Sequence, residues 1–163
     1  MPFEGTILVD TNVILEAHFK GCWKALSGAF QLETVEQCVV ETQTGGQFRR
    51  PELRIDEVSL RASFKAVHPV SQLQIAKVIS AGGDSLDVGE QALWAHALDR
   101  QDAWVLCGPD KASMKFGFQN GHRTQLISLG ELLSKIKFNA SLRRHFEKAW
   151  LDAFLRDLVL GVL

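Results

Sequence analysis

Short apolar runs alternate with amphipathic stretches along most of this chain. The runs are typical of strands and predict them at residues 6–9, 32–35, 65–68, 103–107 and 124–127. Apolar residues recur at helical spacing between the runs, and this predicts helices over residues 13–19, 22–30, 36–44, 56–66 and 128–136. Regular alternation of this kind predicts an α/β fold in which helices cover both faces of a parallel sheet.

Three further helices are indicated by their caps or by their apolar faces. Ser71 is a good N-cap for a helix whose apolar face would comprise Leu73, Ile75, Ala76 and Ile79. Asp87 begins another, and Gly89 near its start suggests a close approach by a neighbouring group. The tail, residues 141–163, places large apolar residues at steps of four. We expect this face to be buried on the domain itself or across a dimer interface.

Composition limits the size and the class of the protein. With 163 residues, 46% of them hydrophobic, the chain predicts one well-filled domain over residues 1–138 and a helical extension over residues 139–163. A formal net charge of -1 lacks the basic excess of a non-specific nucleic-acid binder, so nucleic acid would have to meet a local patch. One such patch is the polar loop over residues 42–55, which carries Arg49, Arg50 and Arg54.

Three widely spaced cysteines, Cys22, Cys38 and Cys107, predict neither a disulfide framework nor a zinc knuckle. Reduced thiols in a cytoplasmic protein are the expectation. The chain shows no secretory signal pattern and no apolar stretch long enough to cross a bilayer, so no membrane partner is expected.

Acidic residues follow two of the predicted strands. Asp10 ends the first strand and Asp110 follows the fourth, and the carboxyl ends of parallel strands share one edge of a sheet. Asp87 and Glu90 lie at a helix start, and Glu41 lies on the helix after the second strand. If these carboxylates converge, their mutual repulsion requires a cation, and oxygen-only ligands favour Mg²⁺ or Mn²⁺. Phosphodiester hydrolysis is the natural reaction of such a site.

Helix capping is the alternative interpretation of the same residues. Asp10 or Thr11 would cap the first helix, and Asp87 with Glu90 fits a capping box that explains both acids without a metal. His68 is interpreted as a strand residue and His96 as a structural helix residue.

The chain resembles the PIN-domain family, in particular its toxin-like ribonuclease branch. The resemblance covers about residues 7–133 and is carried by Val9-Asp10-Thr11-Asn12-Val13-Ile14-Leu15, by Glu41, by Leu86-Asp87-Val88-Gly89-Glu90 with Ala92 and Ala95, and by Val105-Leu106 before Asp110-Lys111. It implies a three-layer α/β/α sandwich with five parallel strands in the order 3-2-1-4-5. It also implies a metal-dependent endonuclease of single-stranded RNA, and many members form dimers and are neutralised by a cognate antitoxin. A homodimer and an antitoxin partner are therefore expected.

On this basis the residues receive predicted roles. Asp10, Glu90 and Asp110 would be catalytic metal ligands, and Glu41 and Asp87 would be further metal ligands. Thr11 and Asn12 would support them, and Lys111, Lys115 and Arg123 would contact RNA phosphates. The chain departs from the family at Cys107-Gly108-Pro109, where many toxins have a threonine before the aspartate. Lys111 follows Asp110 where those toxins have another acid close behind, so the carboxylate count is lower.

Three functions compete at this point. The first is a Mg²⁺- or Mn²⁺-dependent ribonuclease. The second is a catalytically weak scaffold of the same fold that binds RNA or a protein partner. The third is a small-molecule phosphatase, but that chemistry commonly needs a second aspartate two residues after the nucleophile, where this chain has Asn12.

Overall fold

A five-stranded parallel sheet forms the centre of the computed structural model, which describes residues 3–44 and 54–163. The strand order is β3-β2-β1-β4-β5, which confirms the predicted fold class and topology. The strands are β1 Thr6–Val9, β2 Gln31–Val35, β3 Ala66–His68, β4 Trp104–Cys107 and β5 Leu126–Ile127. Every residue of β1 is buried, as a central strand with helices on both faces requires.

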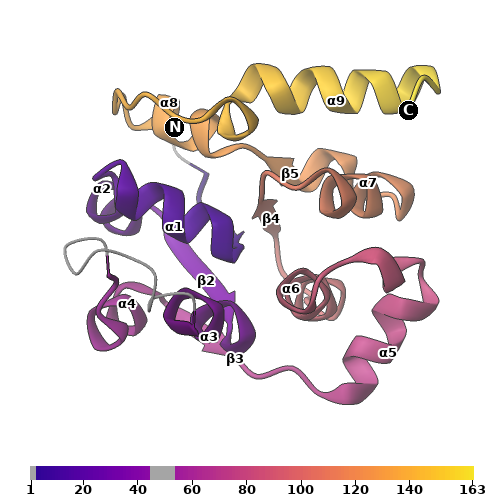
Figure 1. Ribbon diagram of the computed structural model, residues 1–163, viewed down its shortest axis with the longest axis horizontal. Coiled ribbons are helices and arrows are strands. Elements are labelled where there is room, and N and C mark those ends of the chain that lie inside the picture. The colour runs from indigo at the N-terminus through magenta and orange to yellow at the C-terminus, as the bar shows by residue number, and fades with distance from the viewer. Residues whose placement is uncertain (1–2, 45–53) are drawn as a thin grey trace.

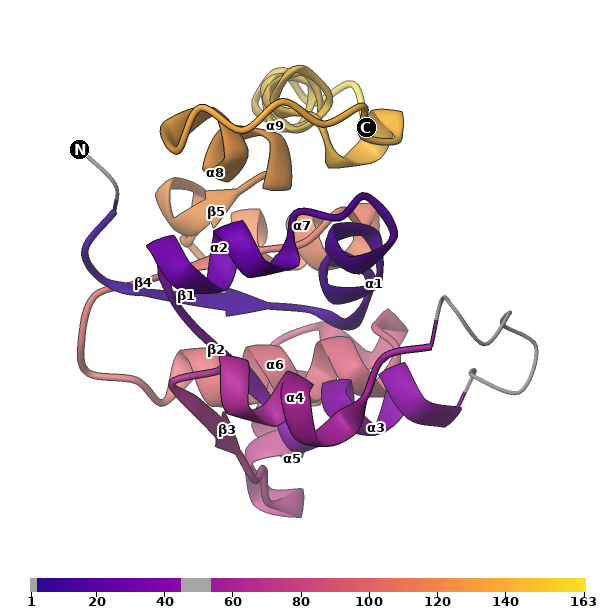
Figure 2. The ribbon, with the colours of Figure 1, turned by 90° about the vertical axis from the view of Figure 1, so that its left-hand side faces the viewer.

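Helices connect the strands and cover both faces of the sheet. They are α1 Thr11–Phe19, α2 Trp23–Ala29, α3 Glu36–Thr44, α4 Glu57–Ser63, α5 Gln72–Ser80, α6 Val88–Leu98, α7 Lys111–Gln119, α8 Leu129–Lys135 and α9 Lys148–Leu160. Three short 3-10 helices complete the described elements: η3 Gly83–Ser85, η4 Arg123–Gln125 and η5 Arg144–Phe146. Figures 1 and 2 show α1, α2 and α4 on one side of the sheet and α5 and α6 on the other.

Four of the strands, β1, β2, β4 and β5, contribute residues to two separate hydrophobic cores, and β3 contributes Val67 to one of them. On the face that α1, α2, α4 and α8 cover, Ile7 and Val9 pack with Leu32. On the opposite face Leu8 and Leu106 pack against α5, α6, α7 and α9. This alternation of a buried strand between two cores defines a three-layer α/β/α arrangement.

The last helix, α9, packs along α7 and α8 (Figure 1). Its buried residues are Leu151, Phe154 and Leu155, and the ring of Trp150 stacks on that of Phe154 at 5.5 Å between centroids. One apolar face of the tail therefore joins the second core. The last residue of α9, Leu160, and the chain end after it, with Leu163, are exposed.

Several predicted boundaries and faces were wrong. The helix predicted over residues 56–66 ends at Ser63, and the helix of the tail begins at Lys148 rather than near residue 141. On α5 Val78 is buried and the predicted Ile75 packs against the second core, whereas Leu73 and Ile79 are 70% and 45% exposed. The final strand, predicted over residues 124–127, is reduced to two residues because η4 takes up its start. Arg49 and Arg50 of the predicted basic loop lie outside the described residues.

All three cysteines are free thiols and are buried. Among the described residues, we find no helix with the length and apolar character that a transmembrane span requires.

Candidate functional site

Asp10 lies where β1 ends and α1 begins. Its backbone N–H donates to the Cys107 carbonyl at 3.3 Å, which ties the ends of the two central strands together. Its side chain is the N-cap of α1, since Oδ1 accepts the Val13 N–H at 3.1 Å. The residue is only 4% exposed, and Oδ2 faces Gly108, where an added Cβ would lie 3.1 Å away. A small residue at position 108 therefore leaves room for this carboxylate.

Two more helices begin at the same edge of the sheet with acidic N-caps. Asp87 caps α6 by accepting the Glu90 N–H at 2.8 Å, and Glu90 Oε2 accepts the Asp87 N–H at 3.2 Å. Asp110 caps α7 by accepting the Ser113 N–H at 3.1 Å. The capping interpretation is confirmed for Asp10 and for Asp87 with Glu90, and the structure adds Asp110 as a third N-cap aspartate. Capping does not compete with ligation here, because each bond occupies only one lone pair of a carboxylate that has several.

Glu41 reaches this edge from α3. Its Oε2 accepts the Thr11 hydroxyl at 2.7 Å, so the predicted supporting residue orients a predicted ligand. The carboxylate packs against Gly89, where an added Cβ would lie 2.5 Å from Oε2. Gly89, near the start of α6, therefore leaves room for the Glu41 carboxylate, which is the close approach that a glycine at this position suggested. We call Asp10, Glu41, Asp87, Glu90 and Asp110 the acidic cluster.

The electrostatics of the acidic cluster show that its members act on one another. Burial raises the pKa of Asp10 to about 7, and the negative charges of Asp87 and Asp110 add to the increase, although the N–H groups of Val13 and Asn12 oppose it. Burial likewise raises the pKa of Glu90 to about 8, together with the charges of Asp110, Asp87 and Asp10. Carboxylates that resist ionisation in this way are stabilised when a cation joins them. The donor set of oxygens alone fits a hard divalent ion.

The carboxylates of the acidic cluster do not yet surround one point. Within the described part of the chain, the one group of three or more His, Cys, Asp or Glu ligand atoms lying within 4.8 Å of one another is a different one. An ion that bound several acids would therefore have to draw them closer together.

Asn12, exposed on the first turn of α1, contributes its backbone N–H to Asp10.

The predicted RNA-binding residues divide into two groups. Lys111 and Lys115 are exposed on α7, next to Asp110, and they line a cavity of about 480 Å³ that also contacts Phe154. Arg123 is exposed in η4, which leads into the amino end of β5. The structure therefore brings the two lysines, but not Arg123, to the edge that carries the acidic cluster.

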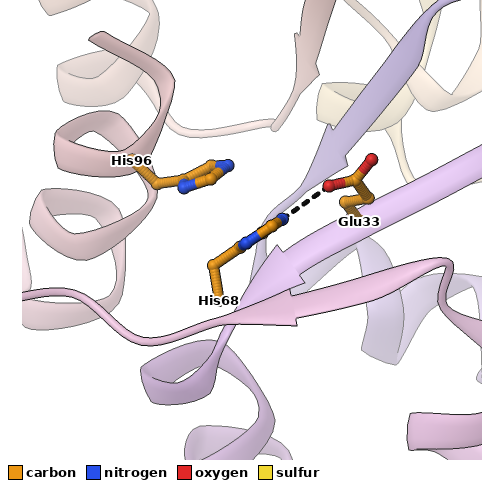
Figure 3. A group of neighbouring side chains, drawn as sticks. All are labelled: Glu33, His68 and His96. Carbon is orange, nitrogen blue, oxygen red and sulfur yellow. Dashed lines mark hydrogen bonds and ion pairs between the residues drawn. The ribbon is translucent and has the colours of Figure 1, made fainter. Parts of the chain in front are cut away.

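A second polar cluster lies on the α6 face of the sheet and was missed from the sequence (Figure 3). Glu33 of β2 is 4% exposed, and its Oε1 meets His68 Nε2 at 2.5 Å and Arg100 Nη1 at 2.9 Å. Its Oε2 accepts the Thr6 hydroxyl at 3.0 Å. The ring of His96 stacks on that of His68 at 3.9 Å between centroids, and Arg100 Nη1 contacts His96 Nε2 at 3.0 Å.

These contacts set the charge states of the second cluster. Burial alone would raise the pKa of Glu33, but the hydrogen bonds from His68, Arg100 and Thr6 lower it below its usual value. Burial lowers the pKa of His96 to about 4, helped by the neighbouring His68 and Arg100. The one sequence signal for this cluster was Glu33, a charged residue inside a strand that is otherwise mostly buried. A buried glutamate is rarely without a partner, so Glu33 indicated that polar groups lie nearby.

Comparison of the chain with models of known protein families and with curated proteins finds no match.

Proposed function

We propose that this protein is a Mg²⁺- or Mn²⁺-dependent endoribonuclease that hydrolyses single-stranded RNA, as its resemblance to the PIN-domain family implies. The observation that carries the proposal is the acidic cluster. Four separate segments bring five carboxylates to the carboxyl edge of the sheet, and two of those carboxylates have a raised pKa.

Asp10, Glu90 and Asp110 would hold the ion, and Glu41 and Asp87 would assist them. When bound, such an ion supplies a water of lowered pKa and neutralises phosphate oxygens. Neighbouring residues of the chain hold these carboxylates in position. The Val13 N–H fixes Asp10, the Thr11 hydroxyl fixes Glu41, and the capping box fixes Glu90. Side chains fixed in this way lose little freedom when substrate binds, which favours catalysis.

RNA would approach over the start of α7. Lys111 and Lys115 are exposed one helical turn apart beside Asp110, so their ammonium groups can contact successive phosphates of a single strand. Contacts of this kind position the backbone without selecting a base. The proposal therefore expects weak sequence preference from these two residues.

The test is cleavage of single-stranded RNA by purified protein in Mn²⁺, with the same sequence as a duplex for comparison. Attack by water does not need the RNA 2′-hydroxyl, so a 2′-O-methyl substitution at the cleaved position should leave the reaction intact. Products that end in a 2′,3′-cyclic phosphate would contradict the proposed chemistry.

The second candidate is a scaffold of the same fold that binds RNA or protein without cleavage. It is favoured by the separation of the acidic ligand atoms and by the lysine that follows Asp110. Calorimetric titration with Mn²⁺ separates the two, because only the enzyme requires metal binding that is lost in Asp10→Asn. The homodimer and the antitoxin partner stay predictions.

A further inference from the structure

We propose that Glu33, His68 and His96 form a binding site for a divalent transition-metal ion of the Zn²⁺ class, separate from the acidic cluster. The three residues come from β2, β3 and α6, on the face of the sheet that α6 covers. The proposal does not rest on ribonuclease activity.

The donor atoms already lie close together. Each residue offers one ligand atom, and the three atoms lie within 4.8 Å of one another. In Figure 3 the two stacked imidazole rings project from β3 and α6 toward the Glu33 carboxylate. An ion at this point would need little movement of the backbone to reach all three.

Hydrogen bonding fixes the state of His96. A guanidinium can only donate, so Arg100 Nη1 requires His96 Nε2, 3.0 Å away, to be the accepting nitrogen. That nitrogen therefore presents a lone pair to the cluster, as a metal ligand must. His68 Nε2 makes its bond to Glu33 Oε1 at 2.5 Å, and a metal ion can replace the proton of this bond once the two side chains move apart, since Zn²⁺ lies about 2.0 Å from each ligand atom.

Arg100 is the group that an incoming ion must displace. Its Nη1 bridges Glu33 Oε1 and His96 Nε2, whereas its Nε and Nη2 bond Asp102 at 2.8 and 2.6 Å and Nη2 also bonds Thr6 at 3.0 Å. The guanidinium is rigid and planar, so Nη1 leaves when the whole group tilts about its paired bonds to Asp102, which it can keep. The buried Glu33 would exchange one cation for another and would stay neutralised.

The chemistry of the donors selects the ion. Two imidazoles and one carboxylate suit Zn²⁺ and its transition-metal neighbours, whereas the oxygen-only acidic cluster suits Mg²⁺ or Mn²⁺. The side chain of His68 is 29% exposed, which gives an ion a way in from solvent. Since β3 is a three-residue edge strand, a bound ion would fasten it to α6 and to the neighbouring strand β2.

The test is Zn²⁺ binding by full-length protein after treatment with a chelator, measured by calorimetry and by the visible absorption of the Co²⁺ form. Wild type and Asp10→Asn should each bind one equivalent at this site. His68→Gln and His96→Gln should weaken binding by at least about a hundredfold, beyond the effect of changing a neighbour of a ligand. His145→Gln, which changes a histidine of η5, is the matched control and should bind like wild type.

Arg100→Gln removes the competing cation and should raise Zn²⁺ affinity by about tenfold, the scale on which neighbours of a ligand act. General damage to the fold would not produce this gain. If His96→Gln does not fold, His68→Gln on the edge strand carries the test. Unchanged binding in His68→Gln, or no Zn²⁺ binding by wild type, would overturn the proposal and leave a hydrogen-bonded ion-pair network only.

Discussion

Replacing Asp10 with asparagine removes one charge from the acidic cluster and changes little else. The amide is nearly the same size as the carboxyl group, and its oxygen can still accept the Val13 N–H that now lies 3.1 Å from Oδ1. The N-cap of α1 is therefore retained. Any change in the free energy of unfolding then reports the cost of the charge itself.

The size of that cost follows from the pKa of Asp10, which burial raises from 3.8 to about 7. Each pKa unit corresponds to about 1.4 kcal/mol, so full ionisation costs the folded state about 4 kcal/mol. Between pH 4 and pH 7 the folded protein keeps a proton that the unfolded chain has lost. The contribution of protonated Asp10 to the free energy of unfolding is therefore fully present below about pH 4. It falls as pH rises and is lost above about pH 7.

Urea unfolding in metal-free buffer at pH 4, 6 and 8 measures the effect. Asp10→Asn should match wild type at pH 4 and exceed its stability by about 4 kcal/mol at pH 8. Asp152→Asn changes an exposed aspartate of α9 and should show no such trend. A difference between Asp10→Asn and wild type that does not vary with pH would contradict a raised pKa of Asp10, because it would place the carboxylate in a solvated environment.

The remaining predictions concern metal, the close approach at α6 and the second cluster. At pH 8, Mn²⁺ at a hundred times its dissociation constant should stabilise wild type by about 2.7 kcal/mol and raise its melting temperature by about 5–10 °C; an unchanged melting temperature would argue against a site. Gly89→Ala should reduce RNA cleavage with under about 1 kcal/mol change in stability, because its Cβ displaces only the flexible end of Glu41. Gly28→Ala, which meets nothing within 4 Å, is its control, and equal activity of both variants would contradict the role of Glu41. Arg100→Ala should lower the free energy of unfolding, measured with urea, by about 3 kcal/mol, because the buried Glu33 charge loses a partner. A loss below about 1 kcal/mol would show that the ion pair is not needed for stability.

The topology and the acidic edge could be predicted because local signals agree there. Short buried runs, each ended by an aspartate that caps the next helix, place Asp10 and Asp110 at one edge of any parallel sheet. The capping box at Asp87 is equally local, since its partner lies three residues away. The order of the strands came from the resemblance to the PIN-domain family rather than from these local patterns.

The second cluster could not be predicted because its contacts join distant parts of the chain. Glu33 meets His68 and Arg100, which lie 35 and 67 residues further along. Seen alone, Glu33 and His68 are ordinary strand residues, and Arg100 is an ordinary polar residue after a helix. The spacing of residues along the sequence does not predict a contact between such distant residues until the register of β2 and β3 is known.

The buried faces of short helices were also difficult to predict from the sequence. On α5 the apolar pattern indicated Leu73 and Ile79, but Val78 packs into the core and the other two are exposed. Helical periodicity alone allows more than one apolar stripe when most positions are apolar. The choice between stripes is made by α6, against which α5 packs.

We propose that the acidic cluster hydrolyses RNA with a bound metal ion. The most direct test of this hydrolysis is the single-turnover rate of cleavage of a single-stranded RNA in Mn²⁺, measured for wild type, Asp10→Asn and Asp152→Asn. We predict cleavage by wild type and Asp152→Asn that a chelator stops, and a rate for Asp10→Asn lower by at least about a hundredfold, the scale of losing one catalytic group. Equal rates for wild type and Asp10→Asn would contradict metal-dependent hydrolysis at the acidic cluster.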